Sequence, residues 1–213
     1  MLRDAGVQKY VQVSFGHQAN DELLDQMFRM RACAFKVRRR WSVEIKGELE
    51  HDGFDDCAPK YLFAHVDGIL LGSLRILPST GPTMIADVFP EILGGQQIPV
   101  GPHVAEVSRL CIDPHLIMNI LDGVTPNMIT RTMLSALFAE MARVHTHTLI
   151  GVHDLMVERI LRQSGWPPQR LGRPIRTDTG LTTVASTFDV PQRPDTSFVA
   201  RSGGFPPRHI NHL

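Results

Sequence analysis

The chain has 213 residues, of which 43% are hydrophobic and 21% charged, a balance typical of a globular protein with a substantial core. Its 22 basic and 22 acidic residues cancel, so composition gives no reason to expect nucleic-acid or membrane binding. No run approaches the roughly 20 apolar residues of a membrane span, and no signal-peptide pattern opens the chain. Three widely spaced cysteines suit reduced thiols. We therefore expect a cytoplasmic protein with one domain over residues 1–190 and a Pro- and Gly-containing flexible tail over 191–213.

The first predicted helix begins at Asn20 or Asp21, either of which can cap it. Apolar residues recur behind the cap at helical spacing, and arginines gather toward the C-terminal end, where cations complement the helix dipole. Residues 39–60 mix charges with glycines and a proline and predict a long loop. Loops of this length are uncommon in compact domains and are often functional or mobile.

Residues 61–66 and 69–77 predict a β-hairpin with Asp67-Gly68 as its two-residue turn. A strand over 104–112 follows, and Thr125-Pro126 then begins a helix whose apolar stripe runs from Ile129 to Val144. A strand over 148–153, a helix capped by Asp154, and a last strand over 182–188 complete the order. This order predicts an α/β (α+β) three-layer sandwich with a mostly antiparallel central sheet, acetyltransferase-like in its second half.

The strand over 104–112 contains an unusual pair of charges, Glu106 and Arg109. A three-residue step puts two side chains on opposite faces of a regular strand, so both can reach one site only if the strand bulges there. Burying a charge costs several kcal/mol unless it has partners. On this segment alone, a structural ion pair and a working site are both open.

Nine charged and aromatic residues recur in a specific order along the chain. They are Arg31, Phe35, Trp41, Asp52, Asp55, Arg75, Phe89, Glu106 and Arg109. This set resembles the pattern of the acyl-homoserine-lactone synthases, the bacterial autoinducer synthases of quorum sensing. The resemblance is strong over residues 23–113 and weaker over 151–165.

The resemblance implies an acyltransferase with two substrates. S-adenosylmethionine supplies the homoserine lactone, and an acyl thioester, on acyl carrier protein or coenzyme A, supplies the acyl group. The amine attacks the thioester, and the methionine carboxylate then displaces the sulfonium, which releases methylthioadenosine. S-adenosylmethionine is thus a substrate, and we expect neither a prosthetic group nor a metal.

The residue types suit this chemistry. A protonated amine is not nucleophilic, so a carboxylate must take its proton, and Glu106 is the candidate general base. Arg109 and Ser108 are the other catalytic candidates, and a bulge beside them could free a backbone N–H for the thioester oxyanion. By resemblance, Phe35 and Trp41 are walls of the S-adenosylmethionine pocket. The remaining substrate-binding candidates are Arg31, Asp52, Asp55, Arg75 and Phe89. Ion pairs among Arg31, Asp52, Asp55 and Arg109 would fold the N-terminal segment over the substrate, with the loop over 39–60 as a lid.

Ordinary alternatives stay open for most of these residues. Trp41 and Phe89 are also typical core residues, Arg31 a typical solvated one, and Asp52 and Asp55 typical turn formers. Arg159 and Arg162 could bind an acidic acyl carrier protein, together with Arg170, Arg173 and Arg176, or could simply form a solvated face. Many members of the family carry a threonine in the strand before the later helix, which is associated with 3-oxo acyl chains, and His153 falls near this position. His153 is either a buried histidine or a substrate contact.

Two other classes of protein compete with this interpretation. A coenzyme-A-dependent N-acyltransferase of the same fold would be expected to carry a Gly-rich loop, and residues 113–126 contain none. A non-catalytic relative would be indicated by loss of Glu106 or Arg109, and both are present. Zinc binding by His145 and His147 with His153 or Cys111 lacks the paired spacing of structural sites.

Overall fold

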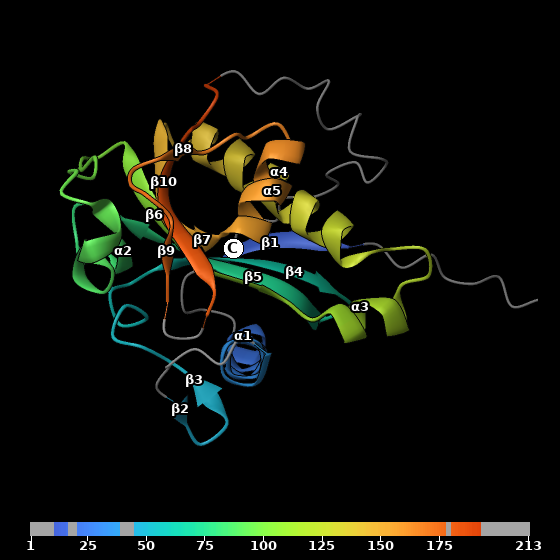
Figure 1. Cartoon of the computed structure of the whole chain (residues 1–213). Helices are drawn as coiled ribbons and strands as arrows, with labels where there is room; N and C mark the ends of the chain where they lie inside the picture. Colours follow the sequence, from blue (N-terminus) through green and yellow to red (C-terminus); the bar gives the residue numbers. More distant parts are fainter. Residues whose placement is uncertain (1–10, 17–20, 39–44, 178–179, 193–213) are drawn as a thin grey trace, which may run out of the picture.

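The computed structural model describes residues 11–16, 21–38, 45–177 and 180–192. Its centre is an eight-stranded sheet in the order β1-β4-β5-β6-β7-β10-β8, with β9 also pairing with β10 (Figure 1). The strands of this sheet are β1 (Gln12–Gly16), β4 (Lys60–Val66), β5 (Ile69–Pro78), β6 (Val104–Ile112), β7 (Thr148–Asp154), β8 (Gln169–Arg170), β9 (Ile175–Arg176) and β10 (Thr182–Asp189). Among the described strands of this sheet only β6 and β7 pair in parallel, so the prediction of a mostly antiparallel sheet is confirmed.

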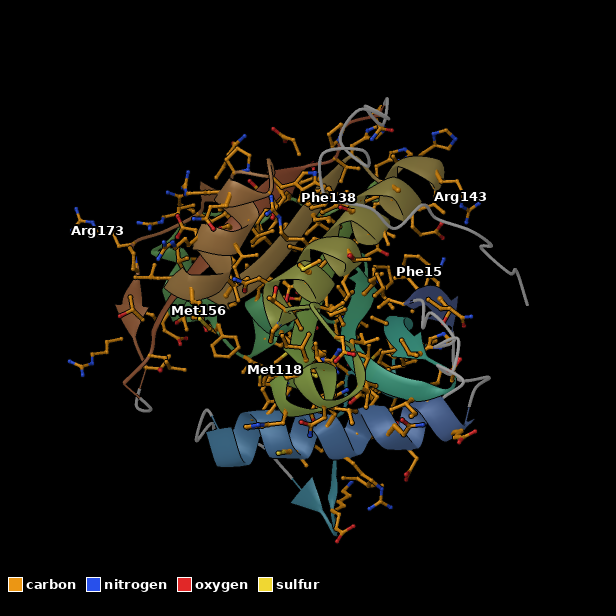
Figure 2. All side chains as sticks on the ribbon, turned by 90° about the vertical axis from the view of Figure 1, so that its right-hand side faces the viewer. Phe15, Met118, Phe138, Arg143, Met156 and Arg173 are labelled. Atoms are coloured by element: carbon orange, nitrogen blue, oxygen red, sulfur yellow. The ribbon has the colours of Figure 1, made fainter. Side chains whose placement is uncertain are left out.

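Helices cover both faces of the sheet, as predicted for a three-layer sandwich. The helical elements are α1 (Asp21–Ala32), η1 (Cys33–Arg38, a π-helix), α2 (Met84–Asp87), η2 (Pro90–Leu93, a 3₁₀-helix), α3 (Pro114–Ile120), α4 (Pro126–Arg143) and α5 (Leu155–Gln163). Figure 1 shows α1 on one side of the sheet, next to a short separate hairpin of β2 (Ile45–Lys46) and β3 (Leu49–Glu50), and α4 with α5 on the other. Turned by 90°, α1 lies along the sheet opposite the layer that holds α3 and α4 (Figure 2).

Side chains alternate between the two faces of the sheet along each strand, so each face has its own hydrophobic core. On β4, Leu62 and Ala64 pack in the cluster with α4, whereas Tyr61 and Phe63 pack in the cluster with α1. A third cluster joins Ile85 and Ile92, from α2 and η2, to β7 and β10. Because neighbouring residues of β7 belong to the first and third clusters, α2 and η2 share the α1 face of the sheet.

Several local sequence signals form the structures that they predict. Asp67 and Gly68 both have positive φ, 50° and 78°, as a two-residue hairpin turn requires. The side chain of Thr125 accepts a hydrogen bond from the Met128 N–H at 3.3 Å and begins α4. The side chain of Asp154 caps α5 by accepting from the Val157 N–H at 2.8 Å. Val144 was expected in the buried stripe of α4, but it ends that helix and is 41% exposed.

Other elements depart from the expectation. Part of the predicted loop over 39–60 forms β2 and β3, and a turn follows in which the Asp55 N–H donates to the carbonyl of Asp52 at 3.0 Å. The elements β1, α2, η2, α3, β8 and β9 were not predicted. For α3 the signal was present, because Asp113 caps the helix at the Leu116 N–H and Pro114 follows directly, as in the Thr125-Pro126 start.

β6 contains a bulge, which is the condition for Glu106 and Arg109 to reach one site. Ser73 of β5 pairs with Cys111 and Arg75 with Ser108, so Arg109 and Leu110 together oppose the single residue between Ser73 and Arg75. Arg109 has a φ of 55°, the left-handed conformation typical of the extra residue in one kind of bulge.

The parallel ladder between β6 and β7 is short. It joins Val104–Glu106 to Thr148–Ile150 and ends there, although β6 continues to Ile112 and β7 to Asp154, all of them described residues. Directly after the last pair, a Cβ on Gly151 would lie 2.7 Å from the carbonyl oxygen of Val107. A side chain at this position would therefore push the two strands apart.

None of the helices in the described part of the chain is long and apolar enough to cross a membrane. All three cysteines are among the described residues, and none forms a disulfide. The division into a domain over 1–190 and a flexible tail over 191–213 remains a prediction, since residues 193–213 lie outside the described part.

Candidate active site

The bulge in β6 collects chemically active side chains on the α1 face of the sheet. Ser108 Oγ accepts a hydrogen bond from Arg75 Nε at 3.1 Å on this face, and Cys111 packs in the α1-side cluster. Val107, Leu110 and Ile112 instead pack with the α4-side core. The extra residue thus shifts the alternation by one position, which places Arg109 on the same face as Ser108.

Three arginines and three carboxylates meet there in a buried network, which we call the arginine–carboxylate network. Its members are Arg31, Arg75, Arg109, Glu50, Asp52 and Asp55. Arg31 has no exposed surface and grips Asp55 with two parallel hydrogen bonds of 2.9 and 2.8 Å, while its Nε donates to Glu50. Equal numbers of opposite charges and fork-shaped pairing offset the cost of burying them.

Asp55 is the carboxylate that ties the network to the sheet. It accepts hydrogen bonds from Arg31, from Arg75 at 2.8 Å, from the Tyr61 hydroxyl at 2.8 Å and from the Asp52 N–H at 2.9 Å. Burial by itself would raise the pKa of Asp55, but the hydrogen bonds and charge of Arg31, together with the charge of Arg75, hold it well below its usual range. Asp55 is therefore ionised whenever the protein is folded near neutral pH.

Arg109 closes the network on the side of the N-terminal helix. Its guanidinium lies 2.6 Å from Asp52 Oδ2 and 2.9 Å from Glu50 Oε1, and its Cζ is 5.3 Å from the centre of the Phe35 ring. Burial lowers the pKa of Arg109, and within the described residues nothing accepts a hydrogen bond from its buried Nε. A buried donor of this kind is costly unless a ligand supplies the acceptor.

Glu106 is a further buried carboxylate of this face, and its hydrogen-bond partners are different. It is 1% exposed, and its oxygens accept hydrogen bonds from the N–H groups of Met84 at 2.9 Å and Ile85 at 2.7 Å, at the start of α2. No ion pair to Glu106 occurs among the described residues. Burial raises its pKa, and the two N–H groups and the charge of Arg75 oppose that rise only in part.

Most of the predicted site residues are brought together. Arg31, Phe35, Asp52, Asp55, Arg75, Ser108 and Arg109 form one connected group, and Glu106 adjoins it through Met84. Phe89 does not join them, because its partly buried side chain packs in the third cluster with Ile85 and Ile92. Trp41 lies outside the described residues.

Sequence reasoning missed three residues of the site: Glu50, Tyr61 and Met84. Glu50 is fully buried between Arg31 and Arg109. Its place two residues before Asp52 is the one sequence signal that could have found it, because the predicted arginines and carboxylates of the site were already equal in number. Tyr61 and Met84 look like ordinary strand and helix residues, and no sequence signal distinguishes them.

Other candidates lie elsewhere. Arg162 of α5 pairs with the buried Glu158, which also binds Arg170 at 2.9 Å, whereas Arg159 is exposed. His153 is buried and hydrogen-bonded, its Nε2 lying 3.0 Å from Ser186 Oγ. His147 stacks on His103 with ring centres 4.8 Å apart. Among the described residues, no three histidine, cysteine, aspartate or glutamate side chains lie together as a metal site would require.

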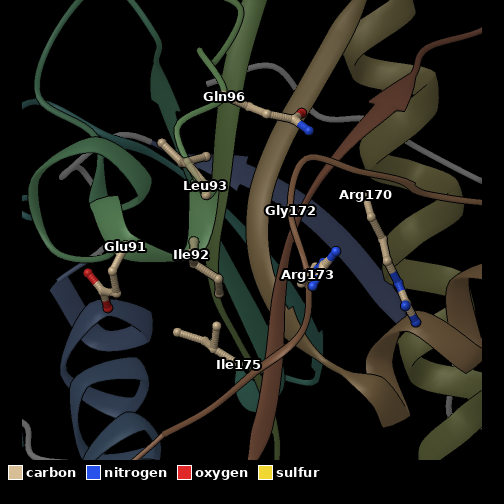
Figure 3. A pocket seen from close by; sticks show the side chains of 9 residues that line it. Glu91, Ile92, Leu93, Gln96, Arg170, Gly172, Arg173 and Ile175 are labelled. Carbon is tan, nitrogen blue, oxygen red and sulfur yellow. The ribbon is translucent and has the colours of Figure 1, made fainter.

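A pocket of about 480 Å³ lies beside η2, apart from the network. It is lined by Glu91, Ile92, Leu93, Gly94, Gln96, Arg170, Gly172, Arg173 and Ile175 (Figure 3). In Figure 3 the side chain of Arg170 extends away from Glu91, in keeping with its ion pair to Glu158 on α5. Apolar side chains of η2 and β9 thus meet Arg170 of β8 and Arg173 of the segment between β8 and β9 here.

Comparison with known proteins identifies the family. The model of the autoinducer synthase family matches residues 15–193. An acyl-homoserine-lactone synthase of Agrobacterium fabrum is 36% identical, covering 71% of this chain and 72% of its own. One of Pseudomonas aeruginosa is 32% identical, covering 76% of this chain and 80% of its own. The chain belongs to the autoinducer synthase family and is an acyltransferase of the acyl-homoserine-lactone synthase type, as the resemblance predicted.

Solved structures agree with the fold. The crystal structure of the synthase LasI has a TM-score of 0.78 and 29% identity, covering 86% of this chain and 91% of that chain. The coenzyme-A-dependent synthase BjaI, solved with S-adenosylmethionine and isopentyl-coenzyme A, has a TM-score of 0.81 at 21% identity, covering 96% and 95% of the two chains. An N-acetyltransferase from Lactobacillus plantarum, with a TM-score of 0.55 and 14% identity, covers 86% of this chain and 99% of its own and shares the acetyltransferase-like fold.

Proposed function

We propose that this enzyme makes an N-acyl-L-homoserine lactone from S-adenosylmethionine and an acyl thioester, with Glu106 as the general base. The observation that carries the proposal is the environment of Glu106. It is a buried carboxylate on which the charge of Arg75 acts, yet its hydrogen bonds in the described structure come from two backbone N–H groups. A raised pKa and free lone pairs suit a carboxylate that must accept a proton.

The reaction balances with one proton acceptor. Glu106 takes a proton from the amine of S-adenosylmethionine, the amine attacks the thioester carbonyl, and the donor thiol leaves. The carboxylate of the methionine part then attacks the carbon that bears the sulfonium, which breaks the C–S bond and releases methylthioadenosine. This second step is intramolecular and expels a good leaving group, so it needs little further help from the protein.

The arginine–carboxylate network would hold S-adenosylmethionine and cover it. The buried Nε of Arg109 offers a donor for a carboxylate, and the Phe35 ring beside it offers an apolar wall. Since Arg31 joins α1 to the segment that contains Glu50 and Asp55, the network fixes the N-terminal part of the chain over the sheet. Trp41 would supply a further wall. Ser108 accepts from Arg75, which favours a role in orienting that arginine.

The thioester would lie where β6 and β7 cease to pair. Beyond Glu106 and Ile150 the ladder ends, so backbone groups of β6 become available to a ligand beside the proposed base. A backbone N–H of the bulged strand would hold the thioester oxygen as negative charge develops on it.

The acyl donor is a carrier protein or coenzyme A, and the basic residues near α5 favour an acidic carrier. Glu158 neutralises Arg162 and Arg170, which leaves the exposed Arg159 and Arg173 to meet an acidic partner. Such charges act mainly on association rate and orientation. Replacing Arg159 and Arg173 by glutamate should raise KM for an acyl carrier protein substrate at least several-fold and leave a small thioester substrate unaffected. A cytoplasmic location belongs to this proposal and is consistent with the three cysteines that form no disulfide.

The decisive experiment supplies the purified protein with S-adenosylmethionine and a panel of acyl carrier protein and coenzyme A thioesters. Mass spectrometry should find an acyl-homoserine lactone and methylthioadenosine in equal amounts. An acylated amine formed without methylthioadenosine would instead establish the N-acyltransferase alternative. Absence of both products across the panel would contradict the proposed function.

A further inference from the structure

Met84 makes contacts to the charged groups of the site in addition to its apolar packing. Its backbone N–H donates to Glu106 Oε2 at 2.9 Å, and its sulfur accepts from Arg75 at 3.0 Å and lies 3.5 Å from a second donor, Arg109. Its carbonyl accepts from the Phe89 N–H at 3.1 Å. The side chain is 7% exposed, so these contacts are shielded from water.

The sulfur contacts are chemically unusual. A thioether is a weak acceptor, and two guanidinium groups would ordinarily be expected to point at oxygen. Arg75 and Arg109 already share Asp52, and one further terminal nitrogen of each guanidinium, Nη2 of Arg75 and Nη1 of Arg109, points at Met84 Sδ. An isosteric leucine would fill the same space without accepting either hydrogen bond, so shape alone does not explain the contacts.

We propose that Met84 is a positioning residue for lactone synthesis, which fixes Glu106 through its main chain and Arg75 with Arg109 through its sulfur. The inference rests on the proposed role of Glu106 as the base. Met84 is the described residue that contacts both the carboxylate and the two guanidiniums, so it sets their relative position. Of the charged groups that act on Glu106, Arg75 of β5 lowers its pKa and Asp87 of α2 raises it.

The test compares Met84→Leu, Met84→Gln and Met141→Leu. Leucine removes the sulfur and keeps the volume, glutamine restores an acceptor on an unbranched side chain, and Met141 is a buried methionine of the α4-side core that serves as a matched control. Circular dichroism and thermal unfolding verify the fold. Lactone formation is then measured against pH with saturating acyl donor and varied S-adenosylmethionine.

We expect Met84→Leu to lower kcat/KM about 10-fold and to move the acid limb of the pH profile upward, because Arg75 is held less closely to Glu106. Met84→Gln should recover most of the loss, and Met141→Leu should stay within about 2-fold of the parent enzyme. Equal values for Met84→Leu and Met141→Leu would overturn the proposal, as would a glutamine variant impaired as much as the leucine one. An inactive parent enzyme would instead contradict the proposed function itself.

Discussion

The carboxyl groups of Glu106 and Asp55 lie on the same face of one sheet, yet their pKa values move in opposite directions. Burial acts on both and disfavours the charged form. Asp55 receives two arginines, whose charge and hydrogen bonds outweigh burial and lower its pKa. Glu106 receives two neutral N–H groups, so burial prevails and raises its pKa. The different hydrogen-bond partners thus make Asp55 a structural anion and Glu106 a candidate proton acceptor.

Glu106→Gln should reduce turnover by at least about 100-fold while S-adenosylmethionine still binds, because an amide cannot accept the amine proton. In the parent enzyme the protonated carboxyl is inactive and its pKa is raised, so kcat should fall on the acid side at a pH above the value of about 4.3 for an ordinary glutamate. Calorimetric binding and a pH profile of lactone release measure both effects. The variant Glu22→Gln, at an exposed position, is the control. Near-normal turnover in Glu106→Gln would contradict the assignment of Glu106 as the general base.

Asp55→Asn should destabilise the protein by about 3 to 5 kcal/mol, because it leaves buried guanidinium groups without their counter-charge. Asp56→Asn provides a matched control, since its side chain is 73% exposed one residue away. Urea unfolding of the two variants measures the difference in the free energy of unfolding. Equal stability of the two would mean that the network contributes nothing to holding α1 on the sheet.

For single residues, most of the charged members of the site could be predicted from the sequence, whereas the residues that contact them could not. Arg31, Asp52 and Arg109 could be identified through the resemblance to the family pattern, since by residue type alone Arg31 is a typical solvated residue and Asp52 a typical turn former. Met84 could not, since its role depends on a sulfur atom that the turn after β5 brings between two arginines. Phe89 packs in the third cluster, outside the connected group, and its substrate-binding role stays a prediction, because an aromatic residue type alone does not separate a core residue from a pocket wall.

Among the elements, the junction of β6 and β7 determines the geometry of the proposed thioester site. The backbones are close at Gly151, directly after the last pair of the ladder, where a Cβ would lie 2.7 Å from the Val107 carbonyl oxygen. This oxygen belongs to the bulged strand that carries Glu106 and Arg109, so relief of the contact would shift either β7 or that strand.

Gly151→Ala should therefore cost about 1 to 3 kcal/mol of stability, the usual range for an overpacked site, and lower kcat more than it raises KM for S-adenosylmethionine. Gly101→Ala is the comparison, because a Cβ there meets nothing within 4 Å. Thermal unfolding and steady-state kinetics report the two quantities. If both alanine variants behave alike, the close approach has no part in positioning the site.

Elements with strong caps or turns could be predicted from sequence, and those held by tertiary contacts could not. Thr125-Pro126 and Asp67-Gly68 specify their own backbone. The two-residue strands β8 and β9 instead exist because β10 offers them an edge, which no local pattern encodes. α2 is a four-residue helix whose first N–H groups are satisfied by Glu106, more than 20 positions along the chain.

In the whole molecule, buried carboxylates anchor helices to both faces of the sheet. Asp55 joins α1 to β5 through Arg31 and Arg75. Glu140 of α4 accepts hydrogen bonds from Lys60 of β4 and from Arg143 at 2.7 and 2.8 Å. The Arg143 hydrogen bonds are the main cause that lowers the pKa of Glu140 to about 2, against the effect of burial.

Stability should therefore fall as the solution is acidified. A carboxyl whose pKa is lowered in the folded state stabilises it above its unfolded value, near 4, and this contribution is lost as the pH falls toward the folded value. Glu140→Gln should cost about 1 to 2 kcal/mol at pH 7 and less below pH 3, since Arg143 is half exposed and partly screened. Thermal unfolding from pH 7 to pH 2.5 should show the stabilities of the Glu140→Gln variant and the parent protein converging. A constant difference in stability over this range would contradict the stabilising role of the ionised Glu140.

Because of the bulge at Arg109, the number of residues in β6 matters for the site as much as their identity. Deleting Leu110 would restore a regular ladder in which Ser108 still faces Arg75 and Cys111 still faces Ser73, and Arg109 would be the single residue left between them. Substitution of Leu110 by another apolar residue leaves the spacing intact, whereas its deletion would turn the guanidinium of Arg109 into the place of Leu110 in the apolar core beside α4. A library scored for lactone production should accordingly tolerate many replacements at this position and no change of length.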